Sequence, residues 1–158
     1  MECNKDLCKS IVDRGHEIGN HTYNHCKLKE MPKEDAEREI MQAQELLFQI
    51  TGQNNKLFRF PYSSCNRKLL RLIHQKGMAS IGWTIDTRDW EGIGAEQIYG
   101  MVINDRKVEA GSIVLMHTTG QHTVEALDRI IPALKAEGYE LVKVSDLFRS
   151  TSVYKRFI

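Results

Sequence analysis

The clearest indication of the fold class is Ser112-Ile113-Val114-Leu115-Met116-His117, an apolar run that leads directly into a histidine. A strand with apolar residues at successive positions is typical of a parallel sheet that is covered on both faces. The flanking segments 95–106 and 123–137 have the apolar spacing of helices, and Gly138 ends the second one. A strand between two helices predicts a parallel sheet whose strands are joined by helical crossovers.

The same alternation extends over the whole chain. Residue patterns predict helices over 4–14, 32–51, 66–76, 95–106, 123–137 and 145–148, and strands over 16–19, 56–60, 79–85, 112–116 and 139–144. This order is typical of an α/β fold, built either as a barrel or as an open doubly wound sheet. In both architectures, functional residues gather at the carboxyl ends of the strands.

Composition argues against several classes of protein. The 158 residues include 22 Lys and Arg and 21 Asp and Glu, so the formal net charge is +1. A length of about 100–200 residues is typical of one domain. The near-neutral charge argues against a broad electrostatic surface for nucleic acid or an anionic membrane. No apolar run approaches the roughly 20 residues that span a bilayer, and the first residues lack the apolar core of a signal peptide.

The cysteines do not suggest a disulfide framework. Cys3, Cys8, Cys26 and Cys65 contain no Cys-x-x-Cys pair and are scattered along the first half of the chain. We therefore expect them to be free thiols.

Four of the five predicted strands are followed directly by residues that are capable of chemistry. These segments are Asn20–His25, Arg59–Tyr62, Asp86–Trp90 and His117–Thr119. Because the carboxyl ends of parallel strands meet at one edge of a sheet, we expect the four segments to form one site.

His21 and His25 have the His-x-x-x-His spacing that is found in zinc sites. The alternative is a pair of exposed or capping histidines. A catalytic zinc ion needs three protein ligands and an open position, so this pair still requires a third ligand, usually a carboxylate. Cys26 or Cys65 is another source of that ligand, because both follow site segments and thiolates bind zinc.

His117 ends the most apolar strand, and its position predicts a general acid that Asp89 or Asp86 lies near enough to orient. We expect Arg59 to pair with a site carboxylate, and Trp90 to stack on a sugar or an acyl methyl group. A divalent ion, an acid and a carboxylate held by arginine suit the hydrolysis of an acyl group. A backbone N–H would help to hold the oxyanion.

These segments resemble the motifs of the NodB-homology polysaccharide deacetylases, carbohydrate esterase family 4. His21-Thr22-Tyr23-Asn24-His25 matches the family's metal motif, His-[Ser/Thr]-x-x-His. Arg59-Phe60-Pro61-Tyr62 matches Arg-x-Pro-Tyr, Asp86-Thr87-Arg88-Asp89-Trp90 matches Asp-x-x-Asp-Trp, and Leu115-Met116-His117 matches Leu-x-His. Four motifs in the family's order make the resemblance specific.

The resemblance implies a metal-dependent hydrolase that removes N-acetyl groups from a GlcNAc-containing polysaccharide, such as peptidoglycan or a chitin-like polymer. It implies that His21 and His25 bind Zn²⁺ or another divalent cation such as Co²⁺. The family's usual substrates imply a location outside the cell or in the cell envelope.

The resemblance also implies a role for each matching position. Arg59 would steady the catalytic base, and the backbone N–H of Tyr62 would bind the oxyanion. Asp89 would tune His117, the general acid. The pocket for the acetyl methyl group would be shaped by Trp90 and Leu115.

One family motif, Thr-Phe-Asp-Asp-Gly, is absent from the sequence. In the family it carries the catalytic base and the third metal ligand at the end of the first barrel strand. The resemblance therefore implies a distorted (β/α) barrel domain over 1–150 that lacks its first strands, followed by a C-terminal tail over 151–158. Smaller departures are Phe60, Ser63 and Thr118, where proline, glycine and aspartate are common in the family.

Three functions remain open. In the first, the chain is part of a working N-deacetylase whose first motif lies before Met1. In the second, it is a catalytically dead fragment that binds glycan or metal weakly. The third is an acetylxylan-type O-deacetylase, because these motifs do not specify the polymer.

Overall fold

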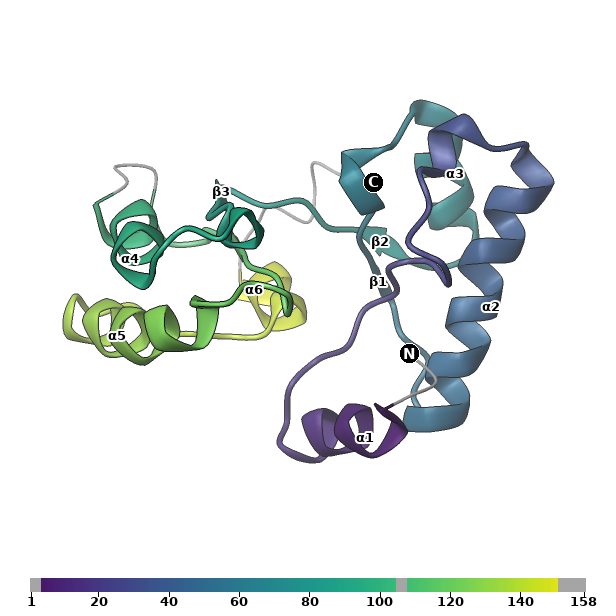
Figure 1. The fold of residues 1–158 in the computed structure, drawn as a ribbon. Helices are drawn as coiled ribbons and strands as arrows, with labels where there is room; N and C mark the ends of the chain where they lie inside the picture. The colour runs from purple at the N-terminus through teal and green to yellow at the C-terminus, as the bar shows by residue number, and fades with distance from the viewer. Residues whose placement is uncertain (1–3, 105–107, 151–158) are drawn as a thin grey trace. The chain divides into compact units, whose positions relative to one another are not determined.

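The computed structural model describes residues 4–104 and 108–150 and divides after Gly82 into two compact units (Figure 1). Both units combine helices with short parallel strands, so the predicted α/β class is confirmed. The division falls inside the predicted 1–150 domain, whose boundary stays a prediction. The predicted tail over 151–158, Cys3 and the end of the predicted helix 95–106 lie outside the described residues.

The first unit is built around a minimal parallel sheet. Its strands are β1 (Leu57–Phe58) and β2 (Ala79–Ser80), and its helices are α1 (Lys5–Asp13), α2 (Lys33–Thr51) and α3 (Arg67–Gln75), with 3₁₀ turns η2 (Leu28–Glu30) and η3 (Pro61–Ser63). Leu57 is paired with Ala79 in β2. Asn20 forms a parallel bridge with Phe58, because its N–H donates to the Leu57 carbonyl and its own carbonyl accepts from the Arg59 N–H.

Local sequence explains where the helices of this unit begin and end. The Asn66 side chain accepts a hydrogen bond of 2.9 Å from Leu69 N–H and so caps the start of α3. Helix α2 ends at Gly52, whose φ of 66° lies in the left-handed region that glycine adopts without a steric penalty.

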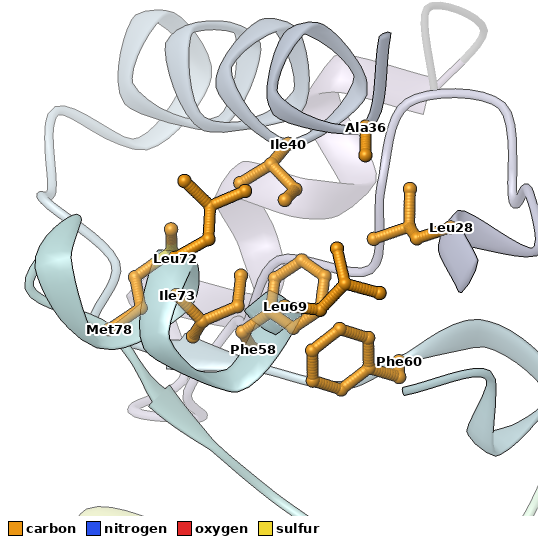
Figure 2. Close-up of a cluster of buried hydrophobic side chains, with 9 residues drawn as sticks. All are labelled: Leu28, Ala36, Ile40, Phe58, Phe60, Leu69, Leu72, Ile73 and Met78. Atoms are coloured by element: carbon orange, nitrogen blue, oxygen red, sulfur yellow. The ribbon is translucent and has the colours of Figure 1, made fainter. Parts of the chain in front are cut away.

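One cluster of buried apolar side chains joins these elements (Figure 2). Phe58 and Phe60 contact each other edge to face with ring centroids 4.8 Å apart. The full cluster is Leu28, Ala36, Ile40, Phe58, Phe60, Leu69, Leu72, Ile73 and Met78. It packs α2 and α3 against β1 and so holds the chain on both sides of the Arg59–Tyr62 segment in place.

The second unit repeats the pattern with its own core. Its strands are β3 (Ile85–Asp86) and β4 (Val114–Leu115), and its helices are α4 (Ala95–Ile103), α5 (Thr123–Ala136) and α6 (Val144–Ser150), with one 3₁₀ turn, η4 (Asp89–Glu91). The strands are parallel, with Ile85 opposite Val114. Helices α4 and α5 lie side by side (Figure 1) and bury Ala95, Ile98, Val102, Ala126, Ile130 and Leu134 between them.

The predicted strands were too long, and two were wrong. Residues 16–19 form no strand, and the nearest pairing is the single bridge at Asn20. The predicted strand over 79–85 is replaced by two short strands, β2 and β3. Residues 139–143 are irregular, because a strand requires a paired neighbour and the described β3 and β4 pair only with each other. Within the described residues, no helix has the length and apolar character needed to cross a membrane.

Candidate active site

Both histidines of the predicted metal motif lie in a tight loop, which we call the histidine loop (residues 20–26). Their imidazole rings contact each other edge to face, with centroids 4.8 Å apart. Thr22 and His25 have φ angles of 65° and 57°, a left-handed conformation that non-glycine residues rarely adopt. The loop therefore places two side chains four residues apart on the same side without a helix.

The carbonyl oxygen of Arg59 orients the ring of His21, since it lies 2.7 Å from His21 Nδ1. A carbonyl can only accept, so Nδ1 carries the hydrogen and the lone pair of the neutral ring is on Nε2. This backbone contact is the kind that fixes the tautomer of metal-binding histidines. The ring of His25 has a different partner, because its Nδ1 lies 3.1 Å from the Tyr62 hydroxyl.

The arrangement fits part of a metal site. Zinc–nitrogen bonds are about 2.0–2.1 Å long, so two imidazoles this close can bind the same ion. No group of three or more His, Cys, Asp or Glu side chains that could hold a metal occurs in the described part of the chain. Cys26 and Cys65 are free thiols there, and burial together with the Glu39 carboxylate raises the pKa of Cys26, which disfavours the thiolate. The structure therefore does not support either thiol as the third ligand.

Arg59 is half-buried beside the end of β2. Its guanidinium donates to the carbonyls of Ile81, at 3.5 Å from Nε, and Gly82, at 3.3 Å from the terminal nitrogen. Burial lowers the pKa of the guanidinium from its usual value. The backbone carbonyl of Arg59 thus contacts His21, while its side chain contacts the residues that follow β2. The pairing of Arg59 with a site carboxylate stays a prediction.

Tyr62 lies in the turn η3 with an unusual backbone conformation. Tyr62 and Ser63 have φ angles of 54° and 52°, and such strain in non-glycine residues is concentrated at functional sites. The Tyr62 side chain is 63% exposed and contacts His25 edge to face, with ring centroids 4.7 Å apart. The first unit therefore brings His21, His25, Arg59 and Tyr62 together, whereas the oxyanion role of the Tyr62 N–H stays a prediction.

In the second unit, Asp89 lies against His117. The buried Asp89 carboxylate accepts from the His117 backbone N–H at 2.7 Å and pairs with ring Nδ1 at 2.8 Å. The Thr123 hydroxyl donates to the same carboxylate at 2.6 Å. Asp86, the other residue considered for this position, accepts instead from the Arg88 N–H and is exposed.

The remaining predicted residues also lie in the second unit. Trp90, in η4, is 56% exposed, which leaves its ring accessible for stacking. Leu115 is buried in β4, and its carbonyl accepts from the Thr87 hydroxyl at 2.8 Å. Their contact with an acetyl group stays a prediction.

Three residues that support these groups were not predicted from the sequence. Glu39 lies on the buried face of α2, and its charge among apolar positions was an available signal. Thr123, at the start of α5, carried no signal. Gly120 resembled an ordinary turn glycine, although a Cβ there would overlap Thr123 Oγ1 and lie 2.8 Å from Asp89 Oδ2.

Comparison with known proteins agrees with the motif assignment. The family model described as polysaccharide deacetylase matches residues 1–81. A peptidoglycan-N-acetylglucosamine deacetylase from Bacillus cereus is 32% identical over 154 residues, which cover 95% of this chain and 55% of that protein. The chain therefore spans about half the length of this relative.

Solved structures give the same result. A crystal structure of a peptidoglycan N-acetylglucosamine deacetylase matches with a TM-score of 0.90 and 31% identity, covering 95% of this chain and 71% of that one. A family 4 carbohydrate esterase pseudoenzyme from Bacillus anthracis matches with a TM-score of 0.86 and 31% identity, covering 92% and 51%. The family match, the relative and these structures together show that the chain belongs to the polysaccharide deacetylase family, carbohydrate esterase family 4, which includes hydrolases named as peptidoglycan deacetylases.

Proposed function

We propose that this chain forms the larger part of a metal-dependent deacetylase that removes N-acetyl groups from a GlcNAc-containing polysaccharide, either peptidoglycan or a chitin-like polymer. The pairing of the buried Asp89 carboxylate with the His117 ring carries this proposal. An ionised partner at Nδ1 leaves Nε2 as the nitrogen that exchanges a proton with a substrate. The names of the relatives support peptidoglycan as the polymer. An enzyme that acts on peptidoglycan would work in the cell envelope or outside the cell.

The residues of this chain divide the work in the proposed reaction. His117 protonates the leaving amine, and Asp89 holds its ring in the required tautomer. Arg59 steadies the catalytic base, while the backbone N–H of Tyr62 stabilises the oxyanion. The acetyl methyl group lies against Trp90 and Leu115.

His21 and His25 hold the metal ion in this proposal, Zn²⁺ or another divalent cation such as Co²⁺. The Arg59 carbonyl supports this, because it directs the lone pair of His21 to Nε2. When bound there, a divalent ion supplies Lewis acidity and lowers the pKa of a bound water. Nitrogen ligands discriminate weakly among divalent transition metals, so the choice of ion depends on supply.

The proposed enzyme also needs a catalytic base and a third metal ligand, which the family carries on an Asp-Asp motif that this sequence lacks. We place the two units in a distorted (β/α) barrel whose first strands carry the Asp-Asp motif. The coverage of the related structure, 71% against 95% of this chain, supports additional secondary structure in the complete domain.

Two alternatives follow from specific observations. The match to a pseudoenzyme favours a catalytically dead protein that binds glycan or metal weakly. The absence of polymer-specific residues from the motifs leaves an acetylxylan-type O-deacetylase as the second alternative.

Acetate release separates the three functions. The 158-residue chain is assayed alone and as a fusion that adds the segment preceding the matched region of the Bacillus cereus relative. N-acetylated chitooligosaccharide, peptidoglycan fragments and acetylated xylan serve as substrates. We expect negligible acetate from the chain alone and release from the GlcNAc substrates by the fusion.

The control variants assign that activity to this chain. H117N in the fusion should abolish release, whereas H122N, which changes a partly exposed histidine of the same unit, should not. Release from acetylated xylan alone would establish the O-deacetylase, and a folded fusion that binds glycan without releasing acetate would establish the inactive protein.

A further inference from the structure

Glu39 is a buried acid with no part in the chemistry proposed above. It lies on the face of α2 that also carries Ala36, Ile40 and Ala43, and only 8% of its surface is exposed. Burial of a charged group is unfavourable unless hydrogen bonds compensate for the lost water. The position of its partners therefore indicates what this carboxylate does.

Those partners all lie in the histidine loop. Oε2 accepts from the Asn24 N–H at 2.8 Å, and Oε1 accepts from the Asn24 side-chain amide at 2.6 Å. The Glu39 backbone carbonyl accepts from the Tyr23 N–H at 3.1 Å. One helical residue thus binds two successive loop positions, Tyr23 and Asn24, which lie between Thr22 and His25.

Asn20 holds the other end of the loop to the same helix. Its side-chain amide donates to the Ile40 carbonyl at 2.9 Å and to Gln44 Oε1 at 3.2 Å. Its side-chain oxygen accepts from the Thr22 N–H at 2.9 Å. Helix α2 therefore restrains the loop on both sides of Thr22 and directly before His25, the two residues that carry positive φ angles.

The loop needs such restraint. Left-handed backbone at non-glycine residues is unfavourable and persists only where the surroundings enforce it, and both Thr22 and His25 have it. Asn24, which Glu39 binds through two hydrogen bonds, directly precedes His25. A change in the backbone of Asn24 would therefore move the His25 ring relative to His21.

We propose that Glu39 is a positioning residue that fixes the backbone of residues 23–26 and so keeps the His25 ring beside the His21 ring. The pairing of the rings is a feature of this structure, and only its use for a metal ion rests on the proposed function. Glu39 acts through the loop and does not touch a reacting atom.

The first test uses E39Q, which keeps the size of the side chain but replaces one acceptor oxygen with a donor. Either the Asn24 N–H or the Asn24 side-chain amide then loses its acceptor. The matched control is E45Q on the same helix, where an exposed carboxylate accepts from Gln49. By nuclear magnetic resonance (NMR), we expect amide exchange at Tyr23 and Asn24 to accelerate about tenfold in E39Q, equivalent to about 1.4 kcal/mol of local opening.

Histidine resonances distinguish positioning from a general structural effect. The ring Cε1–H signals of His21 and His25 should shift in E39Q, while those of His74 and His122 should not. Unchanged exchange and unchanged His21 and His25 signals in a folded E39Q would overturn the proposal, as would equal changes throughout the chain. If E39Q does not fold, N24A provides the test, because Asn24 is exposed and only one hydrogen bond to Glu39 is removed.

A Zn²⁺ titration separates this proposal from the proposed function. Removal of an outer partner of metal-binding histidines lowers affinity roughly 10-fold to 100-fold, and we expect that loss in E39Q but not in E45Q. If no variant binds Zn²⁺ and the exchange and ring signals still change, the positioning by Glu39 holds and the metal site does not. If wild type binds Zn²⁺ and E39Q binds it equally tightly, the positioning role is overturned.

Discussion

The carboxylate of Asp89 binds both N–H groups of His117, one on the backbone at 2.7 Å and one on the ring at 2.8 Å. Burial by itself raises the pKa of this carboxyl, but the hydrogen bonds from His117 and Thr123 outweigh burial and lower it. Asp89 is therefore ionised at neutral pH, and it fixes His117 with Nε2 as the nitrogen that can exchange protons. The parallel pairing of β3 with β4 brings the two residues together, because Asp89 follows β3 and His117 follows β4.

Replacement of the Asp89 carboxylate should destabilise the second unit. In D89N the amide has one acceptor oxygen for three donors, and its NH₂ group faces an N–H or O–H. We expect a loss of about 2–3 kcal/mol in the free energy of unfolding, measured in urea. Both tryptophans, Trp83 and Trp90, lie in the second unit, so their fluorescence reports its unfolding. D86N, at an exposed position, should change the same quantity by less than about 0.5 kcal/mol.

The lowered pKa of Asp89 predicts how the stability of the second unit depends on pH. A carboxyl whose folded pKa lies below its unfolded value of about 3.9 stabilises the fold above that value, and this contribution is lost as pH falls through the folded pKa. The difference in unfolding free energy between wild type and D89N should therefore shrink as the pH falls below about 4. Glu37, whose pKa is lowered by its hydrogen bond and charge pairing with Lys76, is present in both proteins and cancels in the difference. A difference that stays constant to pH 3 would contradict the assignment to Asp89.

Loss of one histidine should weaken metal binding by this chain. Wild type is expected to bind Zn²⁺ weakly, because two nitrogen ligands are one fewer than a catalytic zinc ion needs. In H25A we expect affinity to fall at least about tenfold by calorimetric titration. H74A, at an exposed histidine of α3, should bind as wild type does. Stoichiometric zinc retained by wild type after dialysis would show that the two histidines have a third ligand.

Much of this arrangement could be predicted from the sequence because its signals are local. The apolar spacing of α2 and the glycine after it gave the helix within two residues at each end. Polar residues after four of the predicted strands marked the segments that bring His21, His25 and Tyr62 together in the first unit and Asp89 and His117 together in the second. The strand lengths could not be predicted, because a strand exists only where another segment offers hydrogen bonds.

The supporting contacts were harder to predict because they join residues far apart in sequence. Glu39 is 15 residues from Asn24, and Thr123 is 34 residues from Asp89. Neither separation in sequence follows from the repeat of a helix or a strand, so no residue pattern indicates these contacts. A buried charge in an apolar helix face, as at Glu39, still indicates that a polar partner must lie opposite, and it is the signal to use.

Gly120 should tolerate no side chain, because the space for a Cβ is filled by the Asp89–Thr123 pair. The added carbon in G120A would overlap Thr123 Oγ1 and lie 2.8 Å from Asp89 Oδ2, so the Thr123 hydroxyl must move and Asp89 loses a donor. We expect the second unit to lose roughly 1–3 kcal/mol of unfolding free energy by tryptophan fluorescence, as in other overpacked sites.

The same substitution elsewhere in this unit should have the opposite sign. At Gly100, inside α4, the nearest atom to an added Cβ is Asn104 Nδ2 at 3.5 Å, so G100A should stabilise the helix by up to about 1 kcal/mol. T123V removes the hydroxyl at similar volume, so it should raise the pKa of Asp89 without steric overlap, measured by carboxyl ¹³C NMR. If G120A and G100A change stability in the same direction, crowding against Asp89 and Thr123 is not what excludes a side chain at position 120.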